Sequence, residues 1–208
     1  MNLPAEIFRA GEMLEITGVT RRGFFAPVIM PQHIRRVGSS ALPAAPVIGL
    51  QDALSGRHDC DWVSLRGIVR RDYLQDDRRR LTLMVEGHRV AVAFSGPAPA
   101  AYPRLVGASV SVPGAVSGIF NENAQMTDIR ALQCPDAALV QILQQAPASA
   151  ALKPLSYDQV QGADPAQPAK IQGTLSAQRM GEAVFLTDGI HAAQVRSKEW
   201  LRFAIGDQ

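Results

Sequence analysis

The segment GLQDALSGRHDCDWVSLRGIV, residues 49–69, has a counterpart later in the chain, LSYDQVQGADPAQPAKIQGTL, residues 155–175. The two segments align without a gap at a constant offset of 106 residues. Such internal similarity indicates a structural unit that is used more than once. In each copy, a short helical turn ends at a glycine, and a polar loop leads into a strand with an internal glycine. The matching residues include Asp52 with Asp158, Gly56 with Gly162, and Gly67 with Gly173.

A second match joins the start of the chain to its middle. AGEMLEITGVTRRGFF, beginning at Ala10, aligns with VGASVSVPGAVSGIFN, beginning at Val106, at an offset of 96 residues. Alternating apolar residues resemble any strand, so the match depends on two glycines and a phenylalanine in register. These pairs are Gly11 with Gly107, Gly18 with Gly114, and Phe24 with Phe120.

The middle unit, residues 49–134, contains every expected element in series. Leu81, Leu83 and Val85 alternate with the period of two that is typical of a strand, and Gly87 with His88 is a plausible tight turn. Five short strands within about 75 residues, with little helix, indicate a small barrel. The strands are expected at 62–71, 80–86, 88–94, 108–116 and 126–133.

The two ends of the chain each resemble part of this unit. Residues 11–38 supply only its last two strands, and residues 169–207 supply only its first three. We therefore predict that these halves pair into a second, permuted barrel. Pairing within one chain is favoured because the linkers are long, and pairing between chains would give a swapped dimer or a head-to-tail filament. The strands are expected at 12–20 and 32–37, and at 169–176, 182–187 and 190–196.

The predicted fold class is all-β, with tandem OB-like five-stranded barrels, one intact and one assembled from the two half units. Glycines inside the first and fourth strands suit the coiled sheet of an OB barrel. An SH3-like barrel is the main alternative, and a β-sandwich fits this unit length less well. Residues 135–168 are expected to form a linker with a short helix. In this linker, LVQILQQA at 139–146 has apolar residues at helical spacing.

The composition, 47% hydrophobic and 19% charged with a net charge of +2, is that of a globular protein. The basic residues are scattered, and the triplet at 78–80 directly follows Asp76 and Asp77, which argues against nucleic acid as a partner. No apolar run approaches the roughly 18 residues of a membrane helix, and no signal peptide is evident.

Cys60 and Cys134 are too far apart in sequence for a CxxC pair and lack the further ligands of a zinc site. They are either two buried thiols or one disulfide. Because they bracket the middle unit, we predict that they lie near each other, where a bridge would stabilise the fold by roughly 4 kcal/mol. No metal and no cofactor are expected.

No catalytic motif is present, neither GxSxG nor HExxH nor a phosphate-binding loop, and the four histidines are isolated. We therefore expect a protein that is not an enzyme. OB barrels bind ligands on the face of strands two and three and on two of their loops, here 70–79 and 120–126. The candidate ligand-binding residues are Tyr73, Arg78, Asn121 and Asn123, and the alternative for the asparagines is that they serve only to form turns.

The segments ITGVTRRGFFAPVIMPQHIRRVGSSALP, GLQDALSGRHDCDWVSLRGIVR and SVPGAVSGIFNENAQMTDIRAL together resemble the tandem OB-like repeats in the extracytoplasmic sensory regions of bacterial signalling proteins, such as hybrid histidine kinases and diguanylate cyclases. The resemblance spans roughly residues 11–207.

That resemblance implies a periplasmic or extracytoplasmic sensory or protein-interaction module. Its partners would be an unknown protein or small ligand and other domains of a longer signalling protein. Since the family places a membrane helix after its repeats, and this chain shows neither that helix nor a signal peptide, we expect a fragment of such a protein. The alternatives are an OB-fold protein that binds single-stranded nucleic acid or oligosaccharide, and a hydrolase with an unfamiliar site.

Overall fold

A computed structural model of the chain describes residues 8–23, 27–76, 78–96, 105–148, 151–163 and 168–196. It divides into two compact units, Met1–Ala146 and Pro147–Gln208, which are described separately below. Strands dominate both units, as the predicted all-β class requires. Within the described residues, no helix is long and apolar enough to span a membrane.

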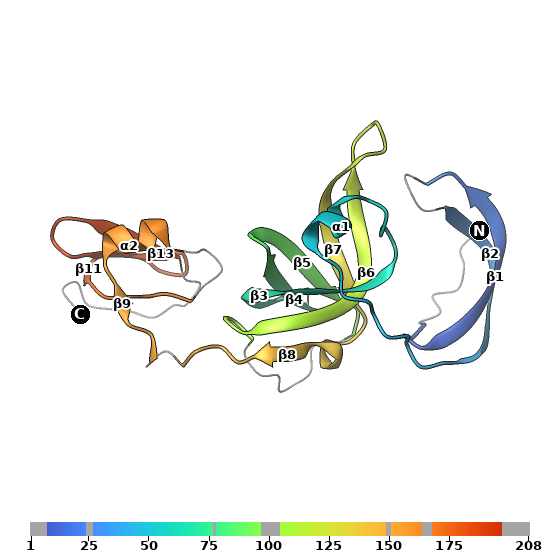
Figure 1. Ribbon diagram of the computed structural model, residues 1–208, viewed down its shortest axis with the longest axis horizontal. Helices are drawn as coiled ribbons and strands as arrows, with labels where there is room; N and C mark the ends of the chain where they lie inside the picture. The colour runs from blue at the N-terminus through green and yellow to red at the C-terminus, as the bar shows by residue number, and fades with distance from the viewer. Residues whose placement is uncertain are drawn as a thin grey trace. The chain divides into compact units, whose positions relative to one another are not determined.

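The first unit contains the predicted five-stranded barrel (Figure 1). Its strands follow the order β3-β4-β5-β7-β6, and β6 returns to pair with β3. The neighbours are antiparallel except β5 and β7, which run parallel. The order closes the sheet, so that each of the five strands has a neighbour on both sides. The strands are β3 (Trp62–Gln75), β4 (Arg78–Val85), β5 (His88–Phe94), β6 (Ser109–Phe120) and β7 (Met126–Cys134).

Alternate residues of these strands fill the barrel. Because strand side chains point to opposite faces in turn, one apolar set points inward and loses all contact with water. Each such side chain contributes about 1.5–3 kcal/mol through burial. The fully buried set includes Leu65, Leu81, Leu83, Val90, Val92, Val110 and Val112.

The turn between β4 and β5 is one residue earlier than predicted. Val85 pairs with His88, so the two turn residues are Glu86 and Gly87. Both have positive φ, 47° and 82°, which is the backbone of a type I′ hairpin turn. His88 therefore begins β5, where its ring contacts Asp128 of β7 at 2.9 Å.

The 106-residue repeat is visible in the backbone. Helix α1 (Leu50–Leu54) precedes β3, and helix α2 (Tyr157–Gly162) precedes β10 (Lys170–Ile171). In the first copy, Val47 forms a parallel bridge to Ser64. In the second copy, β9 (Pro154–Leu155) pairs in parallel with β10. The two copies thus fold alike before their first long strand.

The second unit continues with a three-stranded antiparallel sheet, in the order β11-β12-β13. Thr174 pairs with Thr187 as Ile68 pairs with Met84 in the barrel, which extends the repeat through the first hairpin. Its strands are β11 (Thr174–Arg179), β12 (Ala183–Thr187) and β13 (Ala192–Arg196).

The N-terminal strands β1 (Glu12–Arg21) and β2 (Val28–Ser39) form a two-stranded sheet of their own. Gly11 has a φ of 92° and its counterpart Gly107 has a φ of 87°, so the 96-residue repeat also holds in the backbone. The pairing of the two half units into a second barrel stays a prediction. Residues 197–207 of the C-terminal half unit lie outside the described residues.

The predicted helix at 139–146 is wrong. A single 3-10 turn, η1 (Ala137–Leu139), is followed by strand β8 (Gln141–Gln144), which pairs with β6 at Ser109–Ser111. Strand β7 ends at Cys134 and leaves this part of the β6 edge open, and backbone pairing there outweighs a weak helical spacing. The helix of the linker is α2.

Candidate functional site

The outer face of β3 and β4 gathers basic and aromatic side chains at one end of the barrel. On β4, Leu81 and Leu83 point inward with no exposed area, so Arg78 and Arg80 point outward. Tyr73 pairs directly with Arg80 across the two strands. We call Arg71, Tyr73, Arg78 and Arg80 the basic face.

The basic face combines one aromatic ring with three guanidinium groups. The Arg71 guanidinium lies over the Tyr73 ring, 5.1 Å from its centroid, which is a cation–π contact. Within the described part of the chain, no carboxylate pairs with Arg71, Arg78 or Arg80.

Arg79 has a different role from its neighbours. It points inward, with 5% of its surface exposed, and its guanidinium donates two hydrogen bonds to the Asp72 carboxylate, one of them 2.7 Å long. A paired, hydrogen-bonded charge can be buried without the full cost of desolvation. This ion pair holds the ends of β3 and β4 together beneath the basic face.

The two asparagines belong to the turn between β6 and β7. The Asn121 side-chain oxygen accepts hydrogen bonds from the backbone N–H groups of Asn123 and Gln125, both at 3.0 Å. Its amide nitrogen donates to the Gln125 side chain. Both groups of Asn121 are thus used within the turn, as an Asx turn requires. No contact joins Asn121 or Asn123 to the basic face within the described residues.

Both cysteines are free thiols in the structure, Cys60 exposed and Cys134 buried. The disulfide considered from the sequence is not formed. Burial raises the pKa of Cys134 to about 11. Partial burial, and then the neighbouring Asp59 carboxylate, raises the pKa of the Cys60 thiol. A raised pKa keeps a thiol protonated and unreactive, so neither cysteine has the character of a nucleophile.

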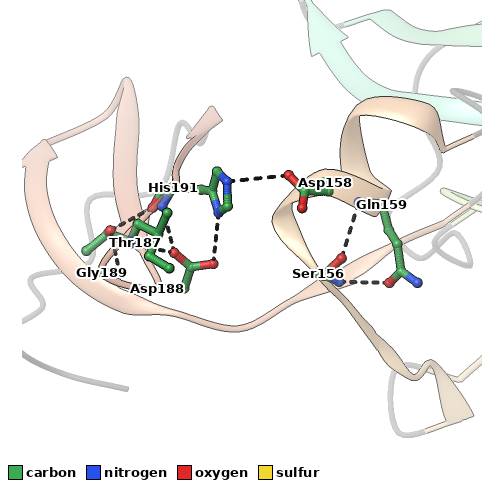
Figure 2. Close-up of polar contacts among 8 residues, drawn as sticks. Ser156, Asp158, Gln159, Thr187, Asp188, Gly189 and His191 are labelled. Carbon is green, nitrogen blue, oxygen red and sulfur yellow. Dashed lines mark hydrogen bonds and ion pairs between the residues drawn. The ribbon is translucent and has the colours of Figure 1, made fainter.

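The second unit contains a polar cluster around His191 (Figure 2). The ring lies between two carboxylates, with Nδ1 3.4 Å from Asp188 and Nε2 3.5 Å from Asp158 of α2. Two backbone N–H groups, of His191 and then Ile190, lower the pKa of Asp188. The Ser156 hydroxyl accepts a hydrogen bond from the Gln159 N–H and caps α2. The contact of His191 with Asp158 connects this helix to the β12–β13 turn.

Of the predicted site residues, the structure brings Tyr73 and Arg78 to one face and leaves Asn121 and Asn123 in a separate turn. Sequence reasoning missed Arg71 and Arg80. The pattern that could have found them is the alternation of Arg71 with Tyr73 and of Arg78 with Arg80. Among the residues that the structure describes, no group of three His, Cys, Asp or Glu side chains could hold a metal ion.

No protein-family model matches the chain, and no curated protein matches it. Among solved structures, the chain is similar to a putative aspartyl-tRNA synthetase from Leishmania major Friedlin, with 14% sequence identity over 65% of this chain and a TM-score of 0.39. The match covers 27% of that enzyme's chain, and at this level it carries no argument about function.

Proposed function

We propose that the chain is a non-enzymatic binding module whose intact barrel presents the basic face to an anionic ligand. The observation that carries the proposal is the Arg71–Tyr73 contact beside Arg80, with no carboxylate paired to either arginine among the described residues. OB barrels bind ligands partly on the segment between their first two strands, and three of the four residues of the basic face lie in that segment, 70–79. A ring that stacks on Tyr73 and a negative charge beside the arginines are the features such a ligand needs.

The sensory or protein-interaction role, in an extracytoplasmic location, is part of this proposal. It is supported by the resemblance of the quoted segments to sensory OB-like repeats and by the chain's organisation in repeated β units. A sensor needs a ligand surface and a connection to other domains. The basic face supplies the first, and a partner domain of the same signalling protein would supply the second.

Single-stranded nucleic acid is a second candidate ligand. One observation favours it: the half-buried Tyr73 ring has an arginine beside it, and OB barrels hold a single strand by stacking bases on aromatic side chains next to basic ones. Such binding would weaken steeply with salt, because each phosphate contact releases a counterion. A small anion held by two arginines would show a much shallower salt dependence.

The test is fluorescence anisotropy of two labelled probes, an oligothymidylate and a sulfated oligosaccharide, each at low and physiological salt. We expect one probe to bind, and Tyr73→Ala and Arg80→Glu each to weaken it about tenfold or more. Arg130→Glu, an exposed arginine of β7, is the matched control and should weaken binding far less. Equal losses in all three variants would show only nonspecific attraction, and no binding of either probe by the native chain would refute the proposed ligand class.

A further inference from the structure

The two sheets outside the barrel have edges that match the edges joined inside it. In the barrel, β3 pairs with β6 from Trp62–Ala115 to Ile68–Ser109. By the repeat offsets of 106 and 96 residues, β10 with the start of β11 corresponds to this part of β3, and β1 corresponds to β6. Each of the two has one paired edge, to β9 or to β2. Among the described residues, no strand pairs with the other edge of either.

We propose that β1 of one copy of the chain pairs with β10 of a second copy and completes a barrel between them. The new barrel would have the order β11-β12-β13-β2-β1, with β1 returning to β10, as in the intact barrel. Each copy offers one β1 edge and one β10 edge, so the assembly is head to tail.

The barrel also defines the register of this contact. Leu65 pairs with Val112, and both are fully buried. The same offsets place Ile171 opposite Ile16. Ile16 is 45% exposed in the structure, and Ile171 is half-buried. Pairing between copies would therefore bury two apolar side chains that the separate sheets leave in contact with water.

Charge complementarity at the next positions favours the same register. In the barrel, the hydroxyls of Ser64 and Ser111 meet across β3 and β6 at 2.8 Å, and both residues are buried. Their counterparts are Lys170 and Glu15, which carry opposite charges. Within the described residues Lys170 has no ion pair, and Glu15 pairs with Arg35 on the exposed face of its own hairpin. Pairing in this register brings Lys170 within reach of Glu15.

The hairpin has the surface expected of a subunit interface rather than of a free strand pair. Its two strands contain no buried residue, and they expose large apolar side chains. An unpaired apolar edge favours strand addition from another chain. The exposed set is Met13, Ile16, Val19, Val28, Ile29, Met30 and Val37.

Charge exchange on the full-length chain tests the proposal by analytical ultracentrifugation. We expect the native chain to associate over roughly a hundredfold range of concentration. Glu15→Lys and Lys170→Glu, each alone, should weaken association about tenfold, because each places like charges at diagonal positions across the two strands, within reach of each other. An equimolar mixture of the two variants should restore it, since every contact between unlike copies then joins one lysine to one glutamate, either as in the native chain or with the two charges exchanged.

Two controls separate this contact from other effects. Arg35→Ala removes the same ion pair inside the hairpin without changing the interface charge, and Arg179→Glu reverses an exposed charge of the second unit. Both should associate like the native chain, and circular dichroism should show every variant folded. A native chain that stays monomeric refutes the proposal. The proposal is also refuted if the mixture associates as weakly as its components while the double variant Glu15→Lys/Lys170→Glu associates like the native chain. Residues 15 and 170 would then meet within one chain and not between copies.

Discussion

The hairpins β1–β2 and β6–β7 come from matching parts of the repeat but differ in how far their side chains are buried. Gly18 and Gly114 both lie against the partner strand, with a hypothetical Cβ 2.2 Å from the Met30 carbonyl oxygen and 2.8 Å from that of Gln133. Yet Val112 of β6 is fully buried, whereas Ile16 of β1 is 45% exposed. Local sequence is therefore sufficient to form the strand and its close approach to the partner strand at the glycine. Burial depends on the neighbour, which β6 has in β3 and β1 lacks among the described residues.

The largest expected difference between the two regions is in stability. Leu65→Ala should lower the free energy of unfolding by about 2–5 kcal/mol, because it leaves a cavity in the closed barrel. Ile16→Ala, in the open hairpin, should change it by about 0.5 kcal/mol or less at a dilution where copies do not associate. Urea unfolding followed by circular dichroism measures both. A loss for Ile16→Ala as large as for Leu65→Ala would mean that the hairpin already has a partner.

The glycines give a second and smaller contrast. A Cβ at Gly114 would lie 2.7 Å from the Leu132 side chain, so Gly114→Ala should cost about 1–3 kcal/mol through overpacking. Gly38→Ala in β2 is the matched control, since its nearest neighbour would be the Met13 sulfur at 3.9 Å. Thermal unfolding of both variants measures the difference. Equal melting temperatures would show that the close approach at Gly114 relaxes without cost.

The smallest expected effect is on the stability of the barrel at acid pH. Hydrogen bonding to His88 and then to the Ile129 N–H lowers the pKa of Asp128, and this contact joins β7 to β5. A lowered pKa stabilises the fold above the ordinary value for an unfolded carboxyl group, and this stabilisation is lost as the pH falls through the folded value. Asp128→Asn should therefore make the barrel slightly less stable at neutral pH and flatten its loss of stability between about pH 5 and 2.

Glu12 provides the hairpin control for that experiment. The Arg9 N–H and then the Arg36 side chain lower the pKa of Glu12, so its carboxylate is held by local contacts in the N-terminal segment. Glu12→Gln should leave the acid unfolding of the barrel as it is in the native chain, measured by tryptophan fluorescence. A Glu12→Gln profile that matched that of Asp128→Asn would show that the hairpin and the barrel unfold as one.

Patterns that depend on local geometry were predictable from sequence. The period-two runs at 81–85 and 108–116 correctly placed β4 and β6, and the paired glycines correctly revealed the repeat. The helix predicted at 139–146 is wrong because part of this segment pairs with an open edge of β6 as strand β8. The sequence alone does not show that edge. The alternation of Arg71 with Tyr73 and of Arg78 with Arg80 was visible in the sequence. That the two pairs share one face was not, because it depends on the β3–β4 register, which is shifted by a bulge after Val69.

Residue-resolved amide hydrogen exchange at two concentrations tests the central claim most directly. The Ser64 N–H bonds to Pro46, so the backbone of Leu65 faces β6, and by the repeat those of Ile171 and Ile16 face the open edges. We expect Leu65 to be protected at both concentrations. Ile16 and Ile171 should exchange freely in dilute solution and become protected together as concentration rises. Protection of both at every concentration, or of neither, would contradict completion of the second barrel by another copy.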